Sequence, residues 1–396
     1  MKITGIDIYI YKLDQHYRLR GLEDTPGRFP GTDYFIEPLW RQAYSRKVES
    51  CLLKVRTDTG ISGWGEAQAP LLPETPGSIL KHLVGPFLIG QNPLRREWAQ
   101  DQLYHMMNVR GHGSGFMLDA IAGVDMALWD IAGKHYGAPV YELMGGPFAT
   151  ELTAYVSGLR QPTLEAQCAA AEKYMDEGYA GIKLFLGHGV EKDVQTIREV
   201  RRAAGPKARL LCDLLWRYGV ADALRVGRAL EREAYDCLEA PVAPEDLAGH
   251  RRLVQALDVP IAVGEALRSV YEFLPWFQQG ALEIVQPDVM RTGLTSARKI
   301  AAMAEARRMP VAPHVGVCTG IGMAATWQFA ASIPNFWIQE YQLELARNSH
   351  LILKTPLETK DGRLVAPSRP GLGVEVDESA VAGLSTDHWR VGEAEP

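Results

Sequence analysis

Six carboxylate or imidazole side chains recur at regular spacing in the second half of the chain, each ending a short apolar run such as Arg209-Leu-Leu-Cys-Asp213. Successive members are 23 or 26 residues apart. One strand, one helix and two short loops occupy a step of this size. The pattern therefore places polar groups at the carboxyl ends of consecutive strands, facing one place. In chain order the six residues are Asp213, Glu239, Glu265, Asp288, His314 and Glu340.

The first three carboxylates, Asp213, Glu239 and Glu265, end three consecutive predicted strands, so their side chains can converge. Carboxylates gathered in one concave place repel one another unless a cation holds them. A ligand set of oxygens without Cys or His suits a hard divalent ion, Mg²⁺ first and Mn²⁺ second. We expect one Mg²⁺ per subunit, with Mn²⁺ as a substitute. The alternative is that these carboxylates only cap helices, and it predicts no metal.

Asp288 and His314 fall on neighbouring strand ends of the same pattern. If they are adjacent in space, Asp288 can accept a hydrogen bond from one imidazole nitrogen. That bond fixes the tautomer and raises the basicity of the ring, which leaves the other nitrogen as a general base. An isolated histidine would more often be a satisfied core or loop residue, and the carboxylate set favours the catalytic interpretation.

Lys183 lies in the middle of the apolar run 182–186. A lysine is costly to bury unless a partner neutralises it. One interpretation is a strand-edge lysine whose ammonium group reaches solvent. The other is a cation that stabilises an anionic group of a substrate.

Strand-like runs alternate with amphipathic helices from Tyr155 to Glu340, and the count gives eight strand candidates. This alternation predicts an α/β fold with a parallel sheet. Eight strands favour a closed barrel, in which active sites lie at the carboxyl ends of the strands. The helices are predicted at 163–177, 221–232, 246–257, 270–279, 295–308 and 319–332.

The first part of the chain predicts a small antiparallel sheet followed by helices. A strand at 3–13 and a hairpin of 48–56 with 61–67 show the alternation or turn residues that strands require. The stretch 13–44 is rich in Arg, Gly, Pro and aromatics and is typical of a functional lid or a disordered loop. After residue 340 the alternation stops, and we expect the tail to return to the N-terminal sheet.

Composition excludes several classes of function. The net charge of −6 and the pI near 6.0 argue against a nucleic-acid partner, which needs a basic surface. Five cysteines without a CxxC pair indicate reduced thiols. No signal-peptide core and no apolar run of membrane-spanning length is visible. We expect a cytoplasmic protein without a membrane partner.

These residues together resemble the enolase superfamily, specifically its mandelate racemase subgroup, over nearly the whole chain. The resemblance implies a modified TIM barrel, (β/α)7β, at 126–354. It also implies an α+β capping domain at 1–125, to which a C-terminal tail at 355–396 returns. The motifs that carry the resemblance are Gly63-Trp-Gly-Glu66, Asp125-Met-Ala-Leu-Trp-Asp130, Gly137-Ala-Pro-Val-Tyr-Glu-Leu-Met-Gly-Gly146, Gln286-Pro-Asp288 and Pro313-His-Val315.

By the same resemblance, Asp213, Glu239 and Glu265 are the Mg²⁺ ligands and His314 with Asp288 is the base. Glu340 matches the acidic residue that hydrogen-bonds the substrate carboxylate. Members of the superfamily abstract the proton α to a carboxylate, with Lys or His bases and Mg²⁺. Removal of that proton creates an enediolate dianion. A divalent ion, Lys183 and Glu340 would offset its charge in a closed, dry site.

Two positions depart from the subgroup. Lys183-Leu-Phe185 stands where Lys-x-Lys is common, and Asp213-Leu-Leu215 stands where Asp-x-Asn is common. Phe185 replaces the second lysine, which is normally the base opposite the histidine. A racemase needs a base on each face of its substrate, so this reaction is disfavoured.

A site with one base fits β-elimination of water. His314 would remove the α-proton of an aldonate or aldarate, the 3-hydroxyl would leave, and a 2-keto-3-deoxy acid would form. The leading hypothesis is therefore a Mg²⁺-dependent acid-sugar dehydratase, a hydro-lyase. The first alternative is a sugar-acid lactone cycloisomerase, which expels a ring oxygen instead of water. The second, from a different class, is a catalytically degenerate metabolite-binding protein.

Substrate selection is expected in the long N-terminal loop and around Gln68. Arg20, Arg28 and Tyr34, with Arg18 beside them, would bind the distal hydroxyls or a second carboxylate of the acid sugar. The alternative is that these arginines only form a solvated surface. Family analogy favours a homo-oligomer, either a dimer or an octamer.

Overall fold

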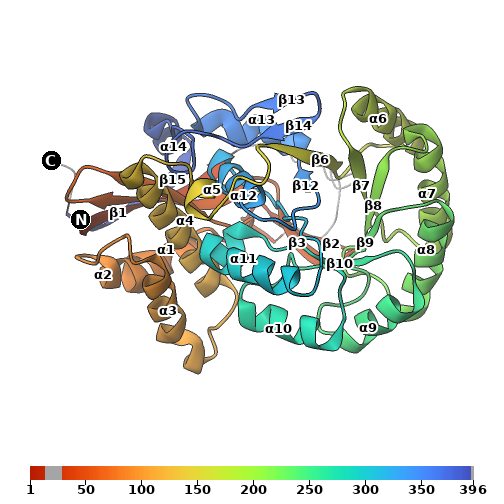
Figure 1. Ribbon diagram of the computed structural model, residues 1–396, viewed down its shortest axis with the longest axis horizontal. Coiled ribbons are helices and arrows are strands. Elements are labelled where there is room, and N and C mark those ends of the chain that lie inside the picture. The colour runs from red at the N-terminus through yellow and green to blue at the C-terminus, as the bar shows by residue number, and fades with distance from the viewer. Residues whose placement is uncertain (14–28, 394–396) are drawn as a thin grey trace.

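The computed structural model describes residues 1–13 and 29–393. An α+β capping domain lies at one end of the molecule and a barrel at the other (Figure 1). The capping sheet is antiparallel in the order β15-β1-β4-β5, so the C-terminal tail returns to the N-terminal sheet as expected. Its strands are β1 (Ile3–Leu13), β4 (Val48–Thr57), β5 (Ser62–Ala67) and β15 (Ser385–Gly392).

The central helix of the capping domain, α4 (Phe116–Tyr136), packs against β5 on one side and against the barrel on the other. It is buried from Met117 to Gly133 because apolar side chains surround the helix. The glycines of the Gly63-Trp-Gly-Glu66 motif allow β5 to pack closely against α4. A Cβ at Gly63 would lie 2.2 Å from the Ala127 carbonyl oxygen. The other capping helices are α1 (Glu74–Ile79), α2 (Gly85–Leu88), α3 (Arg96–Met107) and α5 (Val140–Leu143).

Parallel pairing runs around the second domain and closes it. Neighbouring strands pair from β6 to β11, single bridges at Val311 continue the ring, and β12 pairs with β6. This arrangement confirms the eight strand positions that the sequence predicts. The strands are β6 (Glu151–Ser157), β7 (Gly181–Phe185), β8 (Arg209–Asp213), β9 (Cys237–Glu239), β10 (Ile261–Val263), β11 (Ile284–Val285) and β12 (Gln339–Tyr341).

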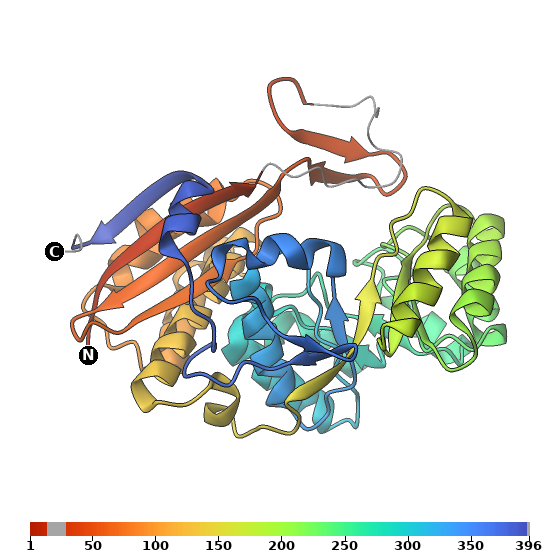
Figure 2. The ribbon, with the colours of Figure 1, turned by 90° about the horizontal axis from the view of Figure 1, so that it is seen from above.

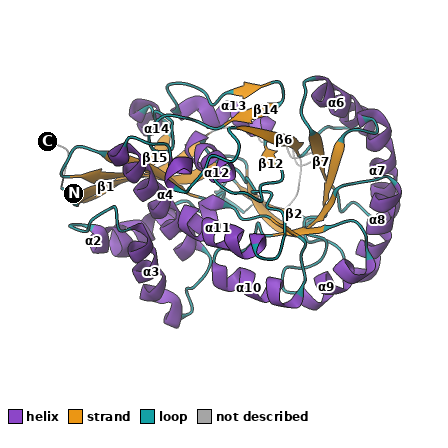
Figure 3. Cartoon of the chain, in the orientation of Figure 1, coloured by secondary structure: helices purple, strands orange, loops and turns teal. Residues whose placement is uncertain are grey.

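Seven helices connect these strands and cover the outside of the barrel (Figure 3). The predicted helix at 295–308 begins earlier, at Val289, because the helical path breaks at Gly293 (φ 70°) and hides the periodicity. Among the described residues, no helix is both long and apolar enough to cross a membrane. The barrel helices are α6 (Leu164–Asp176), α7 (Val190–Ala204), α8 (Val220–Arg232), α9 (Leu247–Ala256), α10 (Val270–Gln279), α11 (Val289–Glu305) and α12 (Gly320–Ala331).

The C-terminal tail crosses between the two domains. Strand β14 (Arg363–Val365) pairs with β6 and with β13 (Thr359–Lys360), and α14 (Glu378–Gly383) then precedes β15. A short helix, α13 (Leu343–Ser349), follows the last barrel strand. The boundary expected between residues 125 and 126 falls inside α4. We therefore propose that the capping domain extends to the end of this helix.

A separate hairpin of β2 (Tyr34–Glu37) and β3 (Gln42–Ser45) projects above the barrel mouth (Figure 2). Trp40 at its tip donates a hydrogen bond from Nε1 to the Leu186 carbonyl at 3.2 Å, and its ring meets His188 edge-on. The tip therefore rests on the loop that follows β7. Arg18, Arg20 and Arg28 lie outside the described residues.

A buried carboxylate fastens α4 to the barrel. Asp125 accepts hydrogen bonds from Thr295 N at 2.8 Å and from Thr295 Oγ1 at 2.5 Å, and Trp129 Nε1 donates to the same hydroxyl at 2.9 Å. Burial raises the pKa of Asp125 from 3.8 to about 6, and the Thr295 hydrogen bonds offset only part of that increase.

This pKa shift gives an expected pH dependence of stability. The folded-state pKa of Asp125 is above its unfolded value, so the folded state binds the proton more tightly between about pH 4 and pH 6. The unfolding free energy therefore falls as pH rises through this window, by about 3 kcal/mol for this group. The Asp125→Asn variant lacks this titration. Between pH 4 and pH 7 its unfolding free energy should therefore rise by about 3 kcal/mol relative to that of wild type. Urea unfolding of both proteins at pH 4 and pH 7 measures this change. A difference in unfolding free energy between variant and wild type that is the same at both pH values would contradict the prediction.

Candidate functional site

Five of the predicted site residues, Asp213, Glu239, Glu265, Asp288 and His314, lie at or just beyond the carboxyl ends of barrel strands, whereas Lys183 and Glu340 lie within β7 and β12. Asp213 and Glu239 are the last residues of β8 and β9, and Asp288 is the N-cap of α11. Left-handed backbone follows two of these ends, at Leu215 (φ 50°) and Ala240 (φ 46°). Such strained residues persist where the surrounding structure holds them, and they are common at functional sites.

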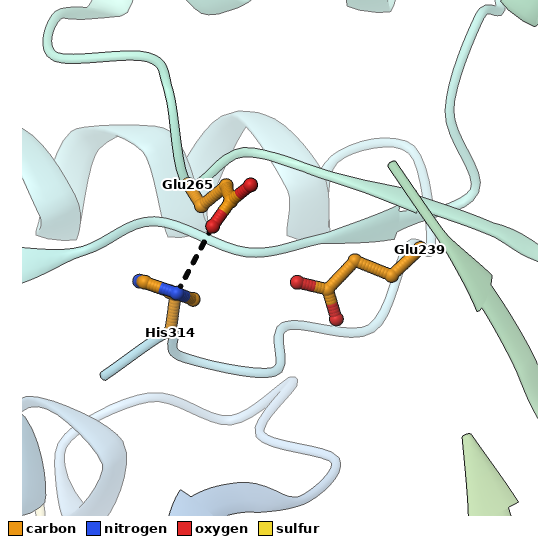
Figure 4. Close-up of side chains that lie close together, drawn as sticks. All are labelled: Glu239, Glu265 and His314. Carbon is orange, nitrogen blue, oxygen red and sulfur yellow. Dashed lines mark ion pairs between the residues drawn. The ribbon is translucent and has the colours of Figure 1, made fainter. Parts of the chain in front are cut away.

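Glu239, Glu265 and His314 form the tightest group (Figure 4). One ligand atom from each lies within 4.8 Å of the others, so the group could hold a metal ion. Glu239 Oε2 accepts from Lys183 Nζ at 2.9 Å and from Gln286 Nε2 at 2.7 Å. Glu239 Oε1 is buried, with no hydrogen-bond partner in the described part of the chain. An orphaned carboxylate oxygen of this kind fits a site that is completed by a cation.

Asp213 lines a cavity at the barrel mouth together with Glu265 and His314, but it stands outside that tight group. Its Oδ1 accepts from Leu215 N at 2.7 Å. Burial raises the pKa of Asp213 well above its usual range, and the negative charge of Glu239 raises it further. A carboxylate in such surroundings needs a nearby positive charge to stabilise its ionised form.

The His314–Asp288 dyad has the predicted geometry. His314 Nδ1 lies 2.8 Å from Asp288 Oδ2, while Asp288 Oδ1 accepts from Met290 N at the start of α11. His314 Nε2 faces the cavity, 3.2 Å from Glu265 Oε2. Burial lowers the pKa of His314, but the charge of Glu340 and the hydrogen bonds to Asp288 and Glu265 together raise it well above its usual value. The ring is oriented to exchange a proton through Nε2.

Lys183 and Glu340 form an ion pair in the wall of the cavity. Lys183 is 1% exposed, and its Nζ lies 3.0 Å from Glu340 Oε1. Glu340 also accepts from Ser157 Oγ at 2.6 Å and from Val315 N at 3.0 Å. Burial lowers the pKa of Lys183, but the charges of Glu239 and Glu340 outweigh that effect and raise it. The lysine is therefore a buried, charged group and not a strand-edge side chain in solvent.

Phe185 fills the position where a second base would stand. Its ring lies 4.9 Å from the Arg160 guanidinium and 5.7 Å from Lys183 Nζ. The ring fits because residue 158 is glycine, since a Cβ there would lie 2.7 Å from Phe185 Cε2. Among the described residues that line the cavity, Arg160 and Lys183 are cations and Phe185 is apolar, whereas the His314 imidazole is a group that could act as a base.

The cavity has a volume of about 310 Å³ and is bounded by the barrel mouth, the β2–β3 hairpin and the end of β5. Tyr34 is not among its lining residues. The Tyr34 hydroxyl donates to Glu49 Oε2 at 3.0 Å and accepts from Leu72 N at 3.2 Å, so it supports the hairpin. The sequence did not predict four further residues that contact the site: Arg160, Trp216, Gln286 and Arg291. Each lies within three residues of the end of a barrel strand or of a strand-end side chain, and this position is the signal that could have identified it.

Comparison with known families covers both domains. Residues 42–145 match the mandelate racemase / muconate lactonizing enzyme N-terminal domain, and residues 166–380 match the enolase C-terminal domain-like family. These two matches together span most of the chain and agree with the capping domain and the barrel described above.

Individual relatives agree with these matches. The chain is 32% identical to D-galactonate dehydratase of Xanthomonas euvesicatoria pv. vesicatoria, over 91% of this chain and 95% of the relative. It is 33% identical to D-galactarolactone cycloisomerase of Agrobacterium fabrum, over 83% and 89%. Its structure is similar to that of a member of the enolase superfamily from Agrobacterium tumefaciens, with a TM-score of 0.93, 30% identity and coverage of 98% and 99%.

Proposed function

The chain belongs to the mandelate racemase and muconate lactonizing enzyme family of the enolase superfamily, and from this premise we propose that it is a Mg²⁺-dependent acid-sugar dehydratase. The substrate is an aldonate or an aldarate, and the product is a 2-keto-3-deoxy acid. The observation that carries this proposal is the His314–Asp288 dyad, which faces the carboxylate cluster while Phe185 occupies the place of a second base. Relatives named as galactonate, arabinonate and xylonate dehydratases support the same reaction.

Asp213, Glu239 and Glu265 would hold the cation. The unpartnered Oε1 of Glu239 and the raised pKa of Asp213 are the features of this chain that support a bound ion. An oxygen-rich ligand set favours Mg²⁺, with Mn²⁺ as a substitute. When bound, the ion supplies positive charge to the substrate carboxylate as the α-proton leaves.

The residues of the chain perform the proton transfer. His314 Nε2 takes the proton from C2, while Asp288 holds the proton on Nδ1 and stabilises the imidazolium. The C2–H electrons move into the enediolate, and the Lys183 ammonium stabilises its charge. The C3–O bond then breaks, and the imidazolium returns its proton to the departing oxygen, which gives water. The enol product tautomerises to the 2-keto acid.

A screen of acid sugars tests the proposal. We expect the purified protein with Mg²⁺ to convert at least one aldonate or aldarate to a product that reacts with semicarbazide and has lost one water. A protein treated with EDTA is the control and should be inactive until Mg²⁺ is restored. Absence of product from the whole library would contradict the dehydratase assignment.

The cycloisomerase alternative is favoured by the similarity to D-galactarolactone cycloisomerase. It predicts that a lactone substrate changes structure without a change in mass, so product mass distinguishes the two reactions. A degenerate binding protein would instead bind acid sugars without exchanging their α-proton in D₂O.

A further inference from the structure

Gln68 brings a polar side chain from the capping domain into the barrel mouth. It directly follows β5, is only 3% exposed and lines the catalytic cavity. Its backbone N–H donates to the Met290 carbonyl at 3.4 Å, which ties the end of β5 to the start of α11. A buried amide at this place needs partners for both its oxygen and its nitrogen.

Arg291 determines which way the amide points. Arg291 Nε donates a hydrogen bond to Gln68 Oε1. A guanidinium group has donors and no acceptor, so the amide oxygen must face Arg291 and the amide nitrogen must face away. Within residues 1–13 and 29–393, no group accepts a hydrogen bond from Gln68 Nε2, and no carboxylate lies within ion-pair distance of Arg291.

Gly316 shows where the amide nitrogen lies. A Cβ built on Gly316 would be 2.1 Å from Gln68 Nε2 and 3.5 Å from His314 Cε1. The amide nitrogen therefore occupies the space beside the His314 ring, on the side of the cavity from which the base works. Glycine at position 316 keeps this space open, and all three residues line the same cavity.

We propose that Gln68 Nε2 donates a hydrogen bond to the oxygen that leaves C3, and that Arg291 is the positioning residue that holds the amide. This inference rests on the proposed elimination. When the C3–O bond breaks, its electron pair moves to the oxygen, and the proton on the His314 imidazolium neutralises it. Gln68 transfers no proton. Its fixed dipole, polarised by the Arg291 cation, stabilises negative charge where that charge develops.

Loss of Gln68 is expected to affect C–O cleavage and C2–H cleavage to different extents, whereas loss of a merely structural residue would affect both steps alike. A donor aimed at the leaving oxygen assists C–O cleavage and leaves C2–H cleavage almost unchanged. The ratio of α-proton exchange to elimination in D₂O therefore reports the role of Gln68. Exchange is measured by NMR on recovered substrate, and elimination is measured as keto-acid product.

We expect Gln68→Leu to lower elimination about 100-fold, as loss of one preorganised donor does in other sites, while α-proton exchange persists. Gln100→Leu is the matched control. Gln100 also donates across the same domain interface, to Ser296 Oγ at 2.6 Å, but lies outside the catalytic cavity. Its ratio of exchange to elimination should equal that of wild type.

Three further variants address folding and positioning. Gly316→Ala places a methyl group where the amide nitrogen lies and should raise the ratio as Gln68→Leu does. Arg291→Met should raise it too, and Arg291→Lys should restore part of the elimination rate. Exchange and elimination that fall in parallel in folded Gln68→Leu and Gly316→Ala proteins would overturn the inference. A wild-type protein without keto-acid product from any acid sugar would instead overturn the dehydratase proposal.

Discussion

His314→Asn is expected to lower kcat by about 10³–10⁴-fold, near the upper end of what a general base contributes. Asparagine is close to histidine in size and can keep a hydrogen bond to Asp288, but it has no nitrogen that takes a proton at neutral pH. His314 Nε2 lies 3.2 Å from Glu265 Oε2 at the cavity, and Phe185, which lines the same cavity, cannot replace it as a base. Turnover is measured as keto-acid product under saturating Mg²⁺.

The same variant should also stop α-proton exchange in D₂O, because the first step of the reaction is lost. Asp288→Asn is the comparison variant with a smaller expected effect. It leaves the His314 imidazole in place but removes the carboxylate that stabilises the imidazolium. We expect a smaller loss of turnover and a lower pKa for His314, whose value the Asp288 hydrogen bond raises. Full turnover in a folded His314→Asn protein would exclude this histidine as the base.

The barrel and the strand-end residues could be predicted because both depend on local repetition. A spacing of 23 or 26 residues is set by the length of one strand and one helix, and parallel strands present their ends on one side. Glu239, Glu265 and His314 therefore converge whatever the loops do. The hydrogen bond between His314 and Asp288 follows from the same repetition, because the two residues occupy neighbouring strand positions.

The contacts between the two domains could not be predicted in this way. Gln68 meets Arg291 across 223 residues of chain, and no periodic pattern links them. Their contact depends on how β5 docks on α11, which the buried packing of α4 decides. Tyr34 shows another contact that composition could not predict, because its hydroxyl is hydrogen-bonded to Glu49 and Leu72 of the capping domain. Its role in substrate binding stays a prediction.

Phe185 illustrates what the structure adds to a substitution visible in the sequence. The sequence indicates that a lysine is missing. The structure shows that the ring is seated between Gly158 and the Arg160 guanidinium, so the space is filled and not vacant. A phenylalanine ring has no group that gives or takes a proton, so it cannot serve as the second base, and this supports elimination over racemisation.

Asp213→Asn is expected to have opposite effects on stability without and with metal. The asparagine Oδ1 can still accept from Leu215 N, so the turn is retained. Loss of the charge removes repulsion with Glu239, which now raises the pKa of Asp213. The variant should therefore unfold at a higher temperature than wild type in EDTA. With Mg²⁺ present the order should reverse, because a site that has lost an anionic ligand binds the ion at least about 100-fold more weakly.

Thermal unfolding with and without Mg²⁺ measures this reversal. Mg²⁺ at a hundred times its Kd should stabilise wild type by about 2.7 kcal/mol, and the variant by much less. Asp236→Asn is the matched control, because Asp236 Oδ2 accepts from Leu210 N at 2.8 Å at the other end of these strands. Its Mg²⁺ response should equal that of wild type. An unchanged Mg²⁺ response in Asp213→Asn would mean that the ion is held by Glu239, Glu265 and His314, which form the tighter group. His314 would then be a ligand and not the base, so this measurement also tests the proposed mechanism.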